Sequence, residues 1–113
     1  MNERDSRILQ KIIDYCDRIA ANLARFDHSY ETFCTDVVFQ DACFMCVLQI
    51  GELAGALSEE FRSANSAVPW RIIKDTRNVY VHAYGTLDQE MVWITLNEDI
   101  PVLREMCLQI KKK

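Results

Sequence analysis

The chain contains very few of the residues that make tight turns. Only three glycines and two prolines occur in 113 residues. β-sheets need frequent turns, and glycine and proline supply many of them. Apolar residues instead recur every three or four positions, which is the period of an amphipathic helix. The sequence therefore predicts an all-α protein with few connections.

Four long helical segments follow from this periodicity. We expect helices over residues 6–25, 36–62 and 69–84, and a last segment that begins at Asp88. Pro101 lies inside that last segment, where its missing backbone N–H must kink or divide the helix. These elements predict a single domain, residues 1–113, with the fold of an antiparallel up-and-down four-helix bundle whose last helix is kinked.

Local signals support the expected helix ends. Asp5 or Ser6 can cap the first helix, since a side-chain oxygen there accepts a backbone N–H. Pro69 suits the first position of the third helix, where no N–H is needed. Gly85 suits the position just past the end of that helix.

The segment 36–62 is apolar over more than one face. A helix of this kind is usually central, or buried by its own bundle and by a partner chain. Gly51 and Gly55 leave a smooth strip on which another helix can approach closely. Glu52 lies between them as a carboxylate in an otherwise apolar region.

Composition excludes several protein classes. Half of the residues are hydrophobic, so the chain is not disordered. No run of 18 apolar residues occurs, so we expect no transmembrane helix and no membrane partner. The charged N-terminus lacks the apolar stretch of a signal peptide, so we expect a cytoplasmic protein. The net charge of −4 argues against a wide nucleic-acid groove but not against a local phosphate site.

Five cysteines, an odd number, are present. Four of them fall in apolar helical patterns, which is typical of reduced, buried cysteines. Cys43 and Cys46 form a CxxC pair, but no second pair accompanies it. A zinc or redox site is therefore not expected, and we predict no metal and no cofactor.

The stretch RNVYVHAYG, residues 77–85, contains an arginine that breaks the helical pattern. At about 100° per residue, Arg77 falls in the apolar arc of its helix. A buried guanidinium needs a partner because it cannot lose its charge. Glu52 is one candidate, in a structural pair that fixes helix register. The other candidate partners for the guanidinium are a phosphate and a second protein chain.

His82 and Tyr84 make a catalytic interpretation of this stretch possible. Phosphodiester cleavage needs a group that shuttles a proton, and a histidine can do so near neutral pH. It also needs a cation that stabilises charge on the phosphate, as Arg77 could. Asn78 lies one turn before His82 and could orient its ring. On an ideal helix, however, His82 lies about 140° from Arg77. The groups converge only if the helix unwinds at its end or if two copies face each other.

The spacing of Arg77, His82 and Tyr84 resembles the R-x4-H-x-Y motif of the HEPN superfamily, and most closely that of the HepT-like toxins. The resemblance extends to flanking stretches from Leu48 onward: LQIGELAGALS, VPWRIIKDTRN and LDQEMVWITLNEDIPVLREM. It implies a helical homodimer with a metal-independent ribonuclease site at the dimer interface. The implied catalytic residues are Arg77, His82 and Tyr84, with Asn78 and Glu52 in support.

The same resemblance implies a biological setting. HepT-like toxins are ribonucleases of type VII toxin–antitoxin systems, with RNA rather than DNA as the substrate. Their partner is an MntA-type nucleotidyltransferase antitoxin, which silences the toxin by AMPylation of a motif tyrosine. Here Tyr84 is the expected acceptor and Tyr80 the alternative.

The sequence also departs from the family pattern. Ala83 stands where many relatives have an acidic residue, and Thr76 stands where many have methionine. These departures affect fine specificity rather than the catalytic positions. The alternative function is a non-catalytic subunit that binds a nucleotide or substrate for a nucleotidyltransferase. Such a subunit would need Arg77 for phosphate binding but not His82 as a base.

Overall fold

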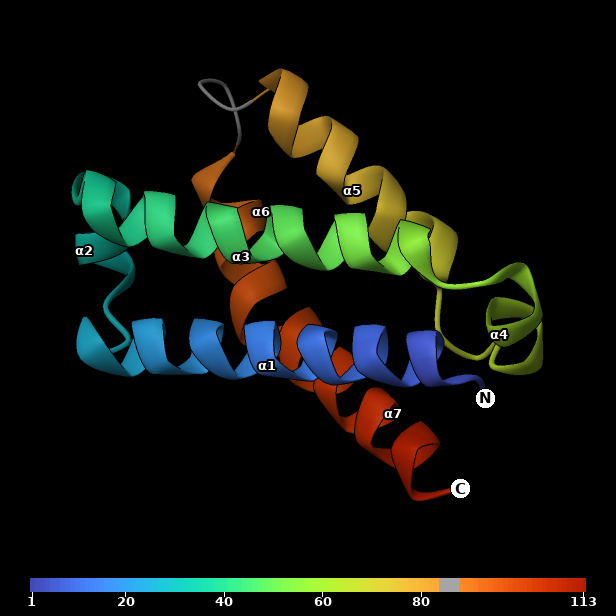
Figure 1. Ribbon diagram of the computed structural model, residues 1–113. Helices are drawn as coiled ribbons and strands as arrows, with labels where there is room; N and C mark the ends of the chain where they lie inside the picture. The colour runs from blue at the N-terminus through green and yellow to red at the C-terminus, as the bar shows by residue number, and fades with distance from the viewer. Residues whose placement is uncertain (84–87) are drawn as a thin grey trace.

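The computed structural model describes residues 1–83 and 88–113, without the side chains of His82 and Ala83. Every regular element in this part of the chain is helical (Figure 1), so the predicted all-α class is confirmed. The elements are α1 (Glu3–Arg25), α2 (Tyr30–Thr35), α3 (Val37–Ala56), α4 (Glu59–Ala64), α5 (Trp70–Ala83), α6 (Gln89–Ile94), the π-helical turn η2 (Thr95–Asp99) and α7 (Ile100–Lys112).

The helices begin at side-chain caps. Asn2 caps α1 by accepting the backbone N–H of Asp5 at 2.7 Å, so the helix starts three residues before the predicted cap at Asp5 or Ser6. Asp88 caps α6 at the predicted position, accepting the N–H of Glu90 at 2.9 Å. Each cap satisfies one of the backbone donors that a helix start leaves open.

The predicted second helix, 36–62, is wrong in its last third. The chain leaves the helix at Leu57, whose φ of −63° and ψ of 145° are extended. Ser58 then caps a separate short helix, α4, by accepting the N–H of Phe61 at 3.1 Å. This break turns the chain away from the axis of α3.

The side chain of Asp5 on α1 stabilises the break between α3 and α4. Its carboxylate is 1% exposed and accepts the Ser58 O–H at 2.6 Å and the Ser58 N–H at 2.9 Å. Burial raises the pKa of Asp5, but the two hydrogen bonds from Ser58 and the nearby charge of Arg4 outweigh it, so the pKa lies below its usual value. The first turn of α1 is thereby joined to the start of α4.

The last helical segment changes direction before Pro101, as predicted. Residues Thr95–Asp99 form a π-helical turn, and Pro101 enters at the first turn of α7. A proline ring collides with the carbonyl four residues earlier in a regular α-helix. The wider π turn relieves this conflict, and the chain bends between α6 and α7 (Figure 1).

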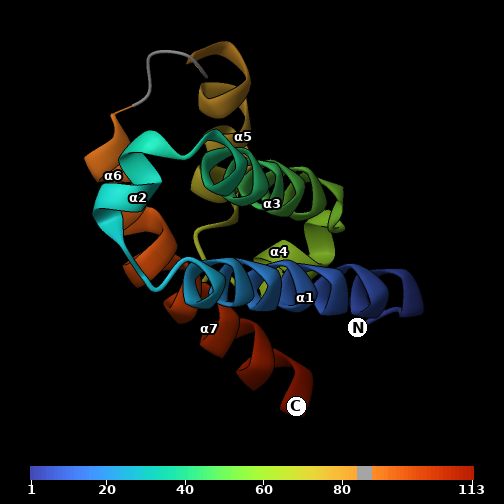
Figure 2. The ribbon, with the colours of Figure 1, turned by 90° about the vertical axis from the view of Figure 1, so that its left-hand side faces the viewer.

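The long helices form two layers. α1, α3 and α5 lie side by side in one layer, with α3 in the middle (Figure 1). The segment α6–η2–α7 crosses behind α3 and α1, as the view turned by 90° shows (Figure 2). α3 is long and apolar enough by composition alone to cross a membrane, a test that core helices of soluble proteins also pass. Its buried residues include Phe39, Cys43, Val47 and Ile50, so α3 is the central helix of the core.

The cysteines belong to this core. All five are free, and every one except the half-buried Cys34 is buried. Burial raises the pKa of Cys16, Cys43 and Cys107 to about 12, so these thiols stay protonated and unreactive at neutral pH.

Gly51 permits the contact between α3 and α5. A Cβ on Gly51 would lie 2.7 Å from the Cβ of Arg77 and 3.1 Å from the carbonyl oxygen of Ile73. Both distances are shorter than a van der Waals contact, so only glycine fits there. A Cβ on Gly55 would meet only the flexible side chain of Lys74, at 3.3 Å. The close approach predicted from the two glycines is present, and it depends mainly on Gly51.

Gly51→Ala is expected to destabilise the fold by about 1–3 kcal/mol, because the backbone of α5 has to move away from α3. The measurement is urea unfolding followed by far-UV circular dichroism. Gly55→Ala is the matched control. It should be neutral or stabilise by roughly 0.5–1 kcal/mol, since alanine favours the helix and Lys74 can yield. Equal losses for both variants would contradict the role given to Gly51.

Asp5→Asn is expected to cost about 1–3 kcal/mol at pH 7, because a buried carboxylate hydrogen bond is lost. The folded-state pKa is lowered, so the contribution of Asp5 is fully present above its unfolded-state pKa and disappears as the pH falls through the folded value. Thermal unfolding from pH 7 to pH 2 should therefore show the wild type and the variant converging in acid. A constant difference across this range would contradict the assignment.

Candidate functional site

The start of α5 is anchored by a buried tryptophan. The ring of Trp70 packs against Phe61 at 5.8 Å between ring centroids, and its indole N–H donates to the carbonyl of Asn65 at 3.0 Å. The carbonyl of Pro69 accepts the N–H of Ile73 at 3.1 Å, so the helix begins directly after the proline. These contacts fix the helix on which Arg77 lies.

Arg77 forms a salt bridge with Glu52 across the α3–α5 contact. Its Nε lies 2.6 Å from Oε2 of Glu52, and the side chains are 42% and 62% exposed. The pairing with Glu52 considered from the sequence is therefore present, but the pair lies at the surface rather than in the core. The reason is that Gly51 receives the Cβ of Arg77, which leaves the guanidinium at the edge of the interface.

The guanidinium of Arg77 retains capacity for a ligand. One Nη donates to Oδ1 of Asn78 at 3.3 Å, and Nε is held by Glu52. Arginine carries five N–H donors in a rigid fork. Among the described residues, none accepts a hydrogen bond from the remaining N–H donors of Arg77. The arrangement suits a phosphate, because the fork is already oriented and still partly solvated.

The structure describes the backbone of His82 but not its side chain, and it does not describe Tyr84. The backbone of His82 is in the last turn of α5, but its side chain lies outside the described residues. Tyr84 and Gly85 also lie outside them. The convergence of Arg77, His82 and Tyr84 therefore stays a prediction.

Tyr80 belongs to the core. It is 5% exposed and its ring meets Phe44 edge to face at 5.7 Å between centroids. Burial raises the pKa of Tyr80, while a hydrogen bond to the side chain of Thr95 partly offsets the change. Its hydroxyl therefore faces η2 instead of solvent, which makes Tyr80 a poor acceptor for any transferred group.

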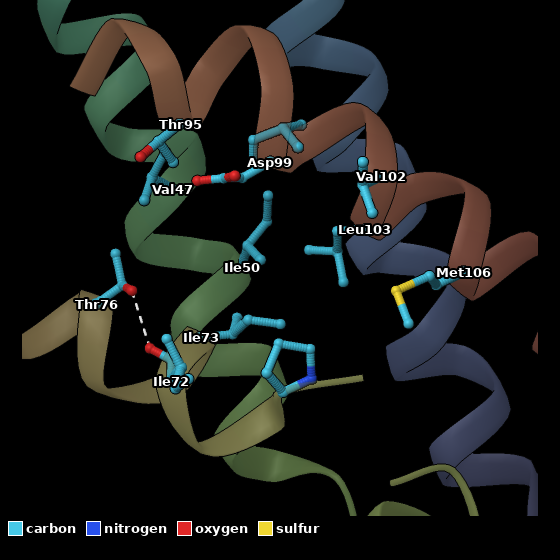
Figure 3. A pocket seen from close by; sticks show the side chains of 12 residues that line it. Val47, Ile50, Ile72, Ile73, Thr76, Thr95, Asp99, Val102, Leu103 and Met106 are labelled. Atoms are coloured by element: carbon cyan, nitrogen blue, oxygen red, sulfur yellow. Dashed lines mark hydrogen bonds between the residues drawn. The ribbon is translucent and has the colours of Figure 1, made fainter. Parts of the chain in front are cut away.

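A groove of about 380 Å³ lies on the other flank of α5. Figure 3 shows Ile72 and Ile73 on one side of it and Val102, Leu103 and Met106 on the other, with Thr95 and Asp99 at one end. The described lining residues include no histidine, cysteine, lysine or arginine. Apart from the carboxylate of Asp99 at its end, this groove is mostly apolar and offers no cation for a phosphate. It therefore does not compete with Arg77 as a phosphate-binding site. Reasoning from the sequence missed it, although Ile72 and Thr76, which both line it, lie one turn apart on one face of the helix.

Exposed apolar side chains also lie on the outward faces of α3 and α5, which carry Glu52 and Arg77. Val38, Met45 and Val81 are 70%, 54% and 47% exposed. Val38 and Met45 lie seven positions apart on α3, and Glu52 follows after seven more, so the three share one outward face. The expectation that α3 is apolar beyond its own core is therefore correct.

No group of three or more histidine, cysteine or acidic side chains within the described ranges could hold a metal ion. Cys43 and Cys46, the CxxC pair, are both buried among apolar residues. Neither cysteine is placed to act at the Arg77 site.

Comparison with known proteins identifies the family. The family model described as "Ribonuclease HepT-like" matches residues 7–110. A protein of Caldanaerobacter subterraneus subsp. tengcongensis named "Putative RNase TTE0752" is 30% identical over 105 residues, which cover 93% of this chain and 92% of the relative. The "Probable ribonuclease HepT" of Thermococcus cleftensis is 28% identical over 104 residues, covering 88% of this chain and 94% of the relative.

No solved structure matches the chain. The family assignment rests on the sequence comparisons, and the helical fold with its surface arginine agrees with it. The chain belongs to the HepT-like ribonuclease family.

Proposed function

We propose that this protein is the ribonuclease toxin of a type VII toxin–antitoxin system, which cleaves RNA in the cytoplasm without a metal ion. The observation that carries the proposal is the state of Arg77. Its guanidinium is oriented by Glu52 and Asn78, remains half-exposed, and keeps donors for an anion. Membership of the HepT-like ribonuclease family makes an RNA phosphate the natural anion.

The proposed chemistry uses three residues of α5 and its C-terminal end. The 2′-hydroxyl of the substrate attacks the adjacent phosphorus and loses its proton to His82. Arg77 stabilises the extra negative charge on the phosphate oxygens. The bond from phosphorus to the 5′-oxygen breaks, that oxygen takes up a proton, and a 2′,3′-cyclic phosphate is left. Tyr84 hydrogen-bonds to the phosphate or stacks on a base.

A second copy of the chain completes the site in this proposal. On one straight helix, His82 lies about 140° from Arg77, so a single α5 does not bring them together unless its end unwinds. Val81 lies one turn from Arg77 on α5, and Met45 and Val38 extend the outward face of α3 away from Glu52. A homodimer would bury this apolar surface. Two helical bundles joined there would place two α5 helices at one interface.

Control by an MntA-type nucleotidyltransferase antitoxin follows from the same site. AMPylation of Tyr84 would place a negatively charged, bulky group beside Arg77 and block the substrate phosphate. Tyr84 is favoured over Tyr80, because the hydroxyl of Tyr80 is buried against η2.

His82→Ala is expected to lower RNA cleavage by about 10²–10⁴-fold, the usual contribution of a general acid–base group. Cleavage of a labelled RNA by purified protein in the presence of EDTA is the measurement, and the product end should be a cyclic phosphate. Equal cleavage by wild type and variant, or none by either, would sink the enzyme proposal. Binding of nucleotide without cleavage would favour the non-catalytic partner subunit instead.

Glu52→Gln is expected to lower kcat by roughly tenfold, because the loss of a positioned charge at the transition state costs about 1.4 kcal/mol. The free energy of unfolding should change by less than about 1 kcal/mol, since the Arg77–Glu52 pair is half-exposed.

Asp17→Asn is the matched control for Glu52→Gln. Asp17 pairs with Arg104 at the same N–O distance of 2.6 Å and with similar exposure, but between α1 and α7 instead of between α3 and α5. Its loss should change stability to a similar extent and leave kcat unaltered. A kcat that falls equally in both variants would show that Glu52 has no positioning role.

A further inference from the structure

Four cations recur at every seventh position of α1. They are Arg4, Lys11, Arg18 and Arg25. Seven residues make almost two full helical turns, so the four side chains project in nearly one direction, about 10 Å apart along the axis. They form a line about 30 Å long, here called the basic stripe.

The basic stripe points away from the core. All four side chains are exposed, whereas the buried residues of α1, such as Ile12, Cys16 and Ile19, lie on the opposite side of the helix. The apolar residues of α1 define its inner face, and the cations of the stripe lie on its outer face.

Most of the stripe is free of carboxylate partners. No described residue forms a salt bridge with Lys11, Arg18 or Arg25. The guanidinium of Arg18 lies 4.8 Å from the centre of the Tyr15 ring, a contact that leaves its charge uncompensated. Arg4 donates one N–H to the carbonyl of Ala56 at 2.7 Å, and its charge also acts on the nearby carboxylate of Asp5.

The acidic residues of α1 do not neutralise the stripe, because most of them have other partners. Asp17 faces α7 and pairs with Arg104, and Glu3 pairs with Arg7 at 3.4 Å. Asp14 accepts a hydrogen bond from Gln10 at 2.9 Å and is the acid nearest the stripe. The protein carries a net charge of −4, yet this outer face of α1 is locally positive.

The chemistry of the stripe selects a polyanion over a membrane or a protein. No large apolar side chain of α1 is exposed. A helix that lies in a membrane interface needs an apolar face, and a protein interface usually has apolar or aromatic anchors. A line of separated cations without apolar neighbours instead suits the repeating phosphates of a nucleic-acid backbone.

α1, which carries the stripe, and α5, which carries Arg77, lie on opposite sides of α3 (Figure 1). Arg4 reaches the carbonyl of Ala56 on α3, and Glu52, the partner of Arg77, lies one turn earlier on that helix. The stripe is therefore on the α3 side of the outer face of α1. Packed helices lie about 8–10 Å apart. A nucleic-acid strand held by Arg77 therefore needs to cross only α3 to reach the basic stripe.

We propose that the basic stripe binds the phosphate backbone of RNA and extends the substrate contact from Arg77 across α3 onto α1. The identity of the polyanion as RNA rests on the proposed function. The stripe does not touch the reacting atoms, so it contributes to substrate binding and not to the chemical step. A substrate strand several nucleotides long is the class of ligand it fits, in place of a mononucleotide.

The test compares variants for binding to a labelled single-stranded RNA whose riboses all carry 2′-O-methyl groups and cannot be cleaved. The triple variant Lys11→Gln, Arg18→Gln and Arg25→Gln should bind about tenfold or more weakly near 0.1 M salt. The slope of log affinity against log salt should fall by about 2, since each phosphate contact to a single strand contributes roughly 0.7. Circular dichroism and the melting temperature check that the exposed substitutions leave the fold intact.

Two controls separate the stripe from total charge. Lys111→Gln, Lys112→Gln and Lys113→Gln remove the same charge from the end of α7 and should leave affinity close to that of the wild type. Lys11→Arg, Arg18→Lys and Arg25→Lys keep the charge and should keep binding. Equal weakening by the stripe and the α7 triple variants, or no RNA binding by the wild type, would overturn the proposal.

A cleavage assay distinguishes this inference from the proposed function. If the stripe variant raises KM for RNA and leaves kcat unchanged, both stand. If the wild type binds the non-cleavable RNA through the stripe and cleaves nothing, the catalytic proposal fails and the stripe stands. If cleavage proceeds with an unchanged KM in the stripe variant, the stripe proposal fails and the enzyme stands.

Discussion

The contact between α3 and α5 at Gly51 organises the rest of the molecule. A side chain on Gly51 would overlap the Cβ of Arg77, so the absence of one sets how closely the two helices approach. This separation brings Glu52 within reach of Nε of Arg77 and leaves the guanidinium at the surface. A larger spacing would break the pair, and a deeper position would bury a charge that cannot be neutralised. The same backbone contact therefore serves stability and the placement of the candidate site.

The second layer is shaped by a local conflict in the last helical segment. The π turn before Pro101 redirects α7 across α1, where Arg104 meets Asp17. Because α7 follows α1, a groove remains between α7 and α5, lined by Ile72, Val102 and other aliphatic residues. The turn also carries Thr95, whose side chain is hydrogen-bonded to the buried hydroxyl of Tyr80. The bend in the last segment thus determines both the open groove and the anchoring of α5.

Much of the fold could be read from the sequence because the signals are local. Helical periodicity, the Asp88 cap and the two glycines of α3 each depend on neighbouring residues. The break at Leu57 escaped prediction because Leu53, Leu57 and Phe61 continue the helical spacing across it. The competing signal was the capping preference of Ser58, which only the tertiary contact with Asp5 makes decisive. Part of the candidate site was also predictable, since a single charge in an apolar arc of the helix pointed to the Arg77–Glu52 pair. The convergence of Arg77, His82 and Tyr84 depends on residues beyond the described ranges.

The packing of α7 on α1 has a consequence for synthesis. Asp17 and Arg104 are 87 positions apart, and α7 crosses and packs against α1, the first helix of the sequence. A ribosome adds roughly 5–20 residues per second, so α1 and α3 emerge several seconds before α7 can cover them. During that interval the side of α1 that carries Ile13 and Cys16 stays open to solvent and to chaperones. The globule can close only after the last helix has left the ribosome, so a nascent or truncated chain has an incomplete core and an exposed apolar surface that proteases can recognise.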